Sequence, residues 1–153
     1  YDIVVSFSYP HEIDFWQATK AIYCAESPTA DRGTLLMIGS CPEGVGNHKS
    51  FLERIGRDDN VATIRAILDK EIAIPYDPLP LAPAAMLAKL RRRIRCAVVS
   101  PGLRREDVEP AGYRWFPNAD DALKRLCAEY PESEVAVVTN SDIVFTTEEE
   151  NHE

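Results

Sequence analysis

The sequence predicts an α/β fold with three layers, in which a mostly parallel sheet of about four to five strands carries helices on both faces. Runs of about six apolar residues, the length of a strand, alternate four times with segments of helical periodicity. These runs are continuously apolar, as expected for parallel strands that are covered on both faces. The alternation of strand and helix favours right-handed crossover connections.

The pattern assigns the elements in chain order. Strands are expected at 1–7, 34–40, 95–100 and 134–139, with a short extended piece at 112–117. Four prolines within 74–83 predict a surface excursion without regular structure. Helices are expected between the Tyr9-Pro10 elbow and Ser27, and over 48–55, 60–70, 84–93, 103–109 and 118–129. Their core stripes are expected to be Ile13, Ala18, Ala21, Ile22 and Ala25; Val61, Ile64, Ala66, Ile67 and Leu68; and Ala122, Leu123, Leu126 and Cys127.

Length limits the number of domains, and charge limits the kinds of partner. The 153 residues predict a single α/β domain over 1–147, followed by an acidic tail over 148–153. Tyr1 stands inside an expected strand, which indicates a piece of a longer protein. A net charge of −8 argues against a nucleic-acid surface, and the basic run 89–95 fits the solvated end of a helix.

Four cysteines are spread through the chain without a Cys-x-x-Cys pair. They indicate reduced thiols and a cytoplasmic protein. His11, His48 and His152 lack metal-ligand spacing, and no apolar run is long enough to span a membrane. We therefore expect no metal site within this chain and no membrane partner.

The helix after Tyr9-Pro10 carries the candidate chemistry. Gln17 and Lys20 are three residues apart, so both side chains leave the same side of the helix. The elbow follows the carboxyl end of a strand, where open α/β sheets bind ligands. An ammonium and an amide there, beside Trp16 and Tyr9, fit the binding of a small carboxylate. The alternative is an ordinary solvated helix face.

These segments together resemble a known family. Their order is a strand, Tyr9-Pro10, the Gln17-x-x-Lys20-Ala21 helix, and the run 33–38 leading into Cys41-Pro42-Glu43-Gly44-Val45-Gly46. This order is similar to that in the C-terminal domain of nickel-pincer lactate-racemase-like proteins. The resemblance is clear over 1–55, looser over 85–145 and weak between them.

The resemblance implies a 2-hydroxy acid racemase or epimerase, an isomerase, in which this chain is a lid inactive by itself. The family's N-terminal domain carries the tethered nickel-pincer nucleotide and a histidine acid/base pair, so no cofactor is expected on this chain alone. The expected partners are that N-terminal domain and a small 2-hydroxy acid. Gln17 and Lys20 match the family's catalytic pair. The chain departs from the family pattern at three places: Trp16 replaces a common Tyr, Phe7-Ser8 replaces a common Gly-Gly, and 81–85 replaces the usual Gly-x-His-Lys-Ala. These departures leave open which substrate is used and whether nickel is bound.

The loop Cys41–Gly46 allows two interpretations. Its glycines suit a phosphate-binding loop, but it lacks the Gly-x-Gly-x-x-Gly and Gly-Lys-Ser/Thr patterns, so it also fits a plain tight turn. The resemblance places Glu43, Gly44 and Gly46 at the substrate cleft beside Tyr9 and Trp16. Cys41 is either a nucleophile or a small buried side chain.

Two further functions remain possible from the residues. The chain could be a non-catalytic module that binds a small carboxylate or a nucleotide, or a structural interaction domain without a ligand. In the last case Trp16 and Lys20 would be merely packed or exposed.

Overall fold

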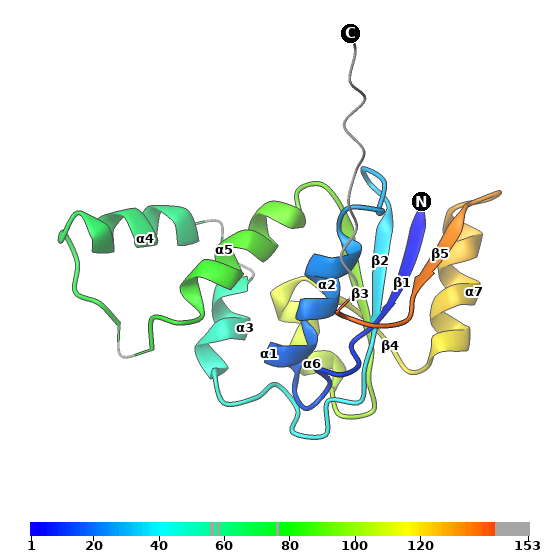
Figure 1. Ribbon diagram of the computed structural model, residues 1–153, viewed down its shortest axis with the longest axis horizontal. Coiled ribbons are helices and arrows are strands. Elements are labelled where there is room, and N and C mark those ends of the chain that lie inside the picture. Colours follow the sequence, from blue (N-terminus) through cyan, green and yellow to red (C-terminus); the bar gives the residue numbers. More distant parts are fainter. Residues whose placement is uncertain (56, 58, 76, 143–153) are drawn as a thin grey trace, which may run out of the picture.

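A sheet of five parallel strands forms the centre of the computed structural model, which describes residues 1–55, 57, 59–75 and 77–142 (Figure 1). The strand order is β4-β3-β2-β1-β5. This confirms the predicted α/β fold with a parallel sheet. The strands are β1 (Ile3–Phe7), β2 (Thr34–Ile38), β3 (Arg95–Val99), β4 (Arg114–Phe116) and β5 (Val135–Val138).

The register aligns the carboxyl ends of the strands. Phe7 of β1 pairs with Ile38 of β2, and Ile38 pairs with Val99 of β3. On the other side of β1, Ser6 pairs with Val138 of β5. The segments that follow these strands therefore leave the sheet at one edge, which we call the carboxyl edge.

Helices cover both faces of the sheet, as predicted. One face carries α1 (Phe15–Ala18), α2 (Lys20–Ala25), α3 (Lys49–Ile55), α5 (Leu81–Leu90) and α6 (Arg105–Val108) with the short 3₁₀ helix η1 (Glu109–Ala111). The helix α7 (Ala119–Glu129) covers the other face. The helix α4 (Asn60–Leu68) packs against α5, away from the sheet (Figure 1).

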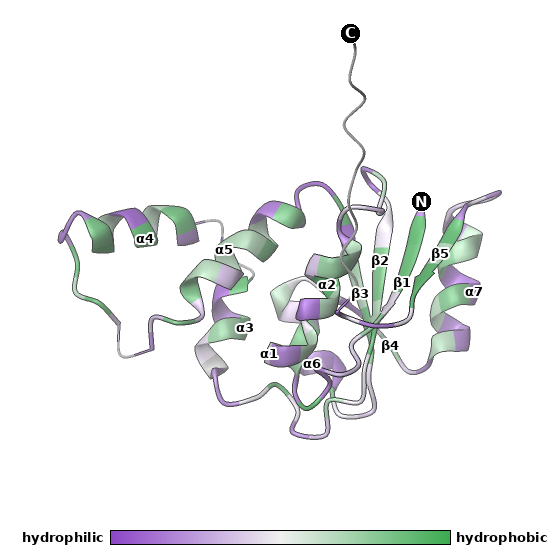
Figure 2. Ribbon diagram, viewed as in Figure 1, coloured by the Kyte–Doolittle hydropathy of each residue, from purple (hydrophilic) through white to green (hydrophobic). Residues whose placement is uncertain are grey.

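The core has two halves because alternate strand residues face opposite sides of the sheet. Val4 and Met37 pack on the side of α1 and α2, whereas Val5 and Leu36 pack against α7. Hydrophilic and hydrophobic residues alternate along α7 (Figure 2), which matches a helix with one buried stripe. Asn118 caps α7 as predicted, its side chain accepting a hydrogen bond from the Asp121 backbone nitrogen at 2.8 Å.

Several predicted core positions are wrong. Ile13 is 51% exposed because it precedes α1, and Phe15 is buried in its place. Cys127 is exposed on the outer side of α7. The last strand, expected to be fully buried, is an edge strand with Val137 57% exposed. The α7 helix packs against β2 and β4, so Val135 and Val137 are exposed on the α7 face of β5, whereas Val138 is buried on the other face.

The boundaries around α4 and α5 also differ from the prediction. The expected apolar stripe of α4 lies mainly at the surface, with Leu68 74% exposed, because α4 contacts α5 and not the sheet. The helix α5 begins at Leu81, three residues before its predicted start, and includes Pro83 in its first turn. A proline is tolerated there because first-turn backbone nitrogens have no helical partner. The first helix is divided at Thr19 into α1 and α2.

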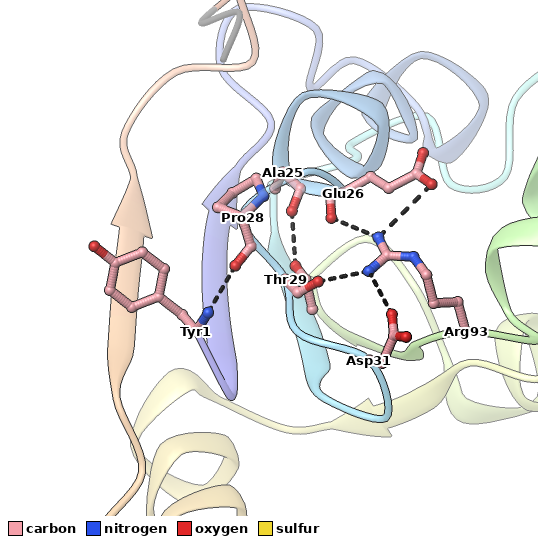
Figure 3. Close-up of polar contacts among 7 residues, drawn as sticks. All are labelled: Tyr1, Ala25, Glu26, Pro28, Thr29, Asp31 and Arg93. Atoms are coloured by element: carbon pink, nitrogen blue, oxygen red, sulfur yellow. Dashed lines mark hydrogen bonds and ion pairs between the residues drawn. The ribbon is translucent and has the colours of Figure 1, made fainter. Parts of the chain in front are cut away.

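Arg93 ties the amino-terminal edge of the sheet together (Figure 3). Its guanidinium donates hydrogen bonds to the backbone oxygens of Glu26 and Thr29, each at 2.7 Å, and pairs with Asp31 at 3.2 Å. The Tyr1 nitrogen donates to the Pro28 oxygen at 2.8 Å in the same region. The connection from α2 to β2 is therefore held at the edge opposite the carboxyl edge.

The four cysteines are free, as expected from their spacing. None of the helices in the described part of the chain is both long and apolar enough to cross a membrane. The acidic tail expected at 148–153, Asp58 and His152 lie outside the described residues.

Candidate functional site

The carboxyl edge is the natural place for a ligand in this topology. The strands β2, β3 and β4 lie on one side of β1, and β5 lies on the other. The direction of the chain connections therefore reverses between β1 and β5. In open α/β sheets, ligands bind beyond the carboxyl ends of the strands at such a point.

Backbone hydrogen bonds join the elbow after β1 to the glycine-bearing loop after β2. The Glu43 nitrogen donates to the Ile13 oxygen at 3.0 Å, and the Phe15 nitrogen donates to the Gly44 oxygen at 2.8 Å. The Cys41 nitrogen donates to the Glu12 oxygen at 2.9 Å. The start of α1 and the loop Cys41–Gly46 thus form one unit on the carboxyl edge.

The backbone conformation and the surroundings of position 46 require a glycine. Its φ of 87° lies in the left-handed region, and a Cβ added there would stand 2.7 Å from Oδ2 of Asp14. Asp14 caps α1 by accepting a hydrogen bond from the Gln17 nitrogen at 2.7 Å. The carboxylate that fills this space favours the tight-turn interpretation of the loop, because it would repel a phosphate.

Gln17 and Lys20 flank the break between α1 and α2. Gln17 is half-buried near the end of α1, and Lys20 is the exposed first residue of α2. Thr19 keeps near-helical backbone angles, and its hydroxyl donates to the Trp16 oxygen at 2.8 Å. The spacing of three residues therefore still places both side chains on neighbouring positions of the helix surface.

No hydrogen bond or ion pair within the described part of the chain engages the ammonium of Lys20 or the side-chain amide of Gln17. Five surface hollows lie over α3, α4 and α5, at the Asp31-Arg32 turn and around 91–96, and neither residue lines any of these five. A ligand held by this pair would therefore lie outside these five hollows.

Trp16 and Tyr9 occupy different surroundings from each other. Trp16 is half-buried and lies edge-on to Phe51, with ring centroids 4.6 Å apart, while its other neighbour is the His48 ring at 4.5 Å. Tyr9 is exposed, and so is Glu43. Within the described residues, no side-chain hydrogen bond or ring contact joins Tyr9, Trp16, Gln17 and Lys20. Trp16 is thus part of the packing between α1 and α3.

Two polar pairs were not predicted from the sequence. His48 Nδ1 lies 2.9 Å from Oδ2 of Asp77, which connects the residue before α3 to the proline-rich excursion. His11 Nδ1 lies 2.9 Å from Oγ of Ser141, which connects the elbow to the turn after β5. The polar run 140–142 directly after the last strand was the available signal. It could be matched to His11 only once β5 was known to lie beside β1.

Cys41 is fully buried, and its thiol is a poor nucleophile at neutral pH. Burial, mainly, raises the pKa of the Cys41 thiol to about 11, although a hydrogen bond from Ser100 acts in the opposite direction. Since the thiolate is the reactive form, the structure favours the interpretation of Cys41 as a small buried side chain.

The described residues contain no group of three or more His, Cys, Asp or Glu side chains that could hold a metal ion. The donor set of this part of the chain therefore does not fit a metal centre of its own.

Comparison with known proteins identifies the fold. No protein-family model matches the chain, and no curated protein sequence matches it. Among solved structures, the chain is similar to the lactate racemase apoprotein from Thermoanaerobacterium thermosaccharolyticum, with a TM-score of 0.76 and 20% sequence identity. The match covers 96% of this chain and 36% of that chain. The chain therefore has a lactate racemase-like fold and spans little more than a third of the length of that structure.

Proposed function

We propose that this chain is the C-terminal, substrate-side domain of a lactate racemase-like 2-hydroxy acid racemase or epimerase and is inactive as an isolated domain. The observation that carries the proposal is a lactate racemase-like fold in which a Gln-x-x-Lys helix pair follows β1 at the carboxyl edge. The domain would comprise 1–147, with 148–153 as an acidic tail.

In this proposal Lys20 and Gln17 anchor the substrate. The ammonium neutralises the carboxylate of the 2-hydroxy acid, and the amide donates a second hydrogen bond. Two such contacts fix the orientation of the Cα–H bond that reacts. Tyr9, Trp16 and the backbone around Glu43, Gly44 and Gly46 would border the same cleft.

The nickel-pincer nucleotide would supply the hydride acceptor and would be held by an N-terminal domain outside this chain. That domain would also supply the missing wall of the cleft, because Lys20 is now exposed to water. An ion pair that is exposed to water contributes little binding free energy, whereas exclusion of water strengthens the attraction between the two charges. The exposure of Lys20 therefore supports a lid that acts only after closure.

The proposal also includes a cytoplasmic location and no nucleic-acid or membrane partner. Four free cysteines support a reducing compartment, since disulfides are rare there. The net charge of −8 supports the absence of a nucleic-acid surface.

Substitution of Lys20 in the complete protein tests the proposal. Lys20→Ala should lower kcat/KM for the substrate by about 10- to 150-fold, the loss expected for a charge-assisted hydrogen bond of roughly 1.5–3 kcal/mol. The assay follows conversion of one enantiomer of each 2-hydroxy acid in a panel by chiral chromatography, with the nickel content measured in the same samples.

Lys124→Ala is the matched control, because Lys124 is an exposed lysine of α7 on the opposite face and its loss changes the net charge equally. Turnover of Lys20→Ala equal to that of Lys124→Ala would contradict the catalytic role. Binding of a carboxylate or a nucleotide without any turnover would favour the non-catalytic module.

A further inference from the structure

Ser141 organises a polar cluster at the point where β1 and β5 diverge. The side chain is 3% exposed, and its Oγ lies 2.9 Å from His11 Nδ1. The same Oγ lies 3.0 Å from the Tyr9 oxygen and 3.2 Å from the Ser8 oxygen. The Ser141 nitrogen donates to the Tyr9 oxygen at 2.8 Å, so the turn after β5 is fixed against the elbow after β1.

These contacts are compatible with a hydrogen bond from Nδ1–H of His11 to the hydroxyl oxygen of Ser141. A serine hydroxyl has one hydrogen, and both backbone oxygens beside Ser141 can only accept it. When the hydroxyl donates to one of these carbonyls, its oxygen accepts a hydrogen bond from Nδ1–H of His11. In the neutral ring, Nε2 is then the atom with the free lone pair.

Charged and titratable groups surround the cluster. Oδ1 of Asp142 lies 3.7 Å from Nδ1 of His11, and the Asp142 side chain is 60% exposed. On the α2 side, the thiol of Cys24 donates to the Ser141 oxygen, and burial followed by the charge of Asp142 raises the pKa of that thiol. Cys24 is therefore neutral, and Glu12 is the adjacent acid in the elbow.

The cluster lies where the topology places a ligand. The elbow and the turn after β5 emerge from adjacent strands on either side of the connection reversal. The His11 side chain is 28% exposed, so it is held by one nitrogen without being covered. No described residue forms a hydrogen bond to its Nε2.

We propose that neutral His11 accepts a hydrogen bond at Nε2 from the hydroxyl group of a small hydroxy acid bound at the carboxyl edge, with Ser141 and Asp142 as positioning residues. This inference rests on the proposed function and adds a contact to the substrate hydroxyl, whereas Lys20 and Gln17 contact the carboxylate. A carboxylate of the same size without the hydroxyl cannot make this contact.

Nitrogen NMR of the chain labelled with ¹⁵N-histidine tests the first part at a pH of about 8.5. The His11 signals should show a proton on Nδ1 and none on Nε2, and His11→Asn identifies them by their loss. Ser141→Ala should move the ring toward the Nε2–H form, which is the commoner form of a free imidazole. A His11 ring with its proton on Nε2 in the unsubstituted chain would overturn the inference.

Paired ligands test the second part on the complete protein, labelled and assigned in the same way, because the proposed carboxylate contacts form only when its two domains close. Lactate and propionate, and then 2-hydroxybutanoate and butanoate, are added to about 100 mM. The hydroxy acid of at least one pair should shift the Nε2 signal, while its deoxy partner should not. An Nε2 signal that responds equally to both members, or to none of the four compounds, would overturn the inference.

The variant His11→Asn separates this result from the proposed function. Asparagine keeps an N–H donor near the position of Nδ1 and lacks an equivalent of Nε2. In the complete protein this variant should raise KM for the hydroxy acid at least fivefold without loss of thermal stability. Full activity of His11→Asn together with an inactive Lys20→Ala would refute the role of His11 and leave the proposed function standing.

Discussion

Gly46 shows how one residue fixes the geometry of the carboxyl edge. A turn was predictable from the two glycines of the loop, but the neighbour that requires Gly46 was not. Asp14 lies 32 positions earlier in the sequence, and only the folded chain brings its carboxylate against Gly46. The same carboxylate caps α1, so the loop and the helix that bears Gln17 depend on one another.

Gly46→Ala should lower the free energy of unfolding by roughly 1–3 kcal/mol, through left-handed strain and the clash with Asp14. Gly44→Ala is the control, because Gly44 has a φ of 66° but its added Cβ would meet its nearest atom, the Gly102 oxygen, at 3.7 Å. Urea denaturation followed by tryptophan fluorescence measures both variants. Equal losses in the two variants would show that Asp14 imposes no constraint on position 46.

The burial of Cys41 affects the stability of the protein at alkaline pH. Its pKa is raised from an ordinary value of 9.0 to about 11 in the folded chain. Between these two pH values the unfolded chain releases the thiol proton while the folded chain retains it. Stability must therefore fall as the pH rises through this window.

We expect the free energy of unfolding of the protein to decrease steadily between about pH 9 and pH 11. Cys41→Ala should show a shallower decrease, although Cys96 and Tyr23, whose pKa values are also raised by burial, will keep part of it. Urea titrations at several pH values give the two slopes. A variant slope as steep as that of the unsubstituted chain would exclude Cys41 as a source.

Among the elements, the strands and the cap of α7 were predictable and the strand order was not. Apolar runs located β1, β2, β3 and β5 within a few residues, and Asn118 marked the start of α7. The position of β5 at the edge beside β1 depends on contacts more than 130 residues apart, such as Ile3 with Val135. For this reason the pairing of His11 with Ser141 was invisible in the sequence.

The link between α2 and β2 depends on the Arg93 fork at the amino-terminal edge (Figure 3). Arg93→Ala should lower the free energy of unfolding by roughly 1.5–3 kcal/mol, because two backbone oxygens lose a charged donor. Arg93→Lys should recover only part of this loss, since one ammonium cannot reproduce a two-pronged contact.

Arg125→Ala is the control for charge removal. Arg125 forms an exposed ion pair with Glu129 one helical turn away, and such pairs contribute about 0.3–0.5 kcal/mol. Chemical denaturation of the three variants gives the comparison. A loss for Arg93→Ala no larger than that for Arg125→Ala would contradict the role of the fork.

At the scale of the whole molecule, the fold was more fully predictable from the sequence than the candidate site. The layered architecture follows from periodicity, and the structural likeness over 96% of the chain agrees with it. The site does not follow in the same way. Gln17 and Lys20 lie on the expected helix, but Lys20 is exposed to solvent in this chain, and Trp16 packs against α3.

The central claim is that a small hydroxy acid binds between this domain and a second domain. Calorimetric titration of the same 2-hydroxy acid into the isolated chain and into the complete protein tests that claim most directly. The account predicts binding to the complete protein with an affinity at least about 100-fold higher than for the isolated chain. Equal affinities in the two titrations, or binding to neither, would contradict it.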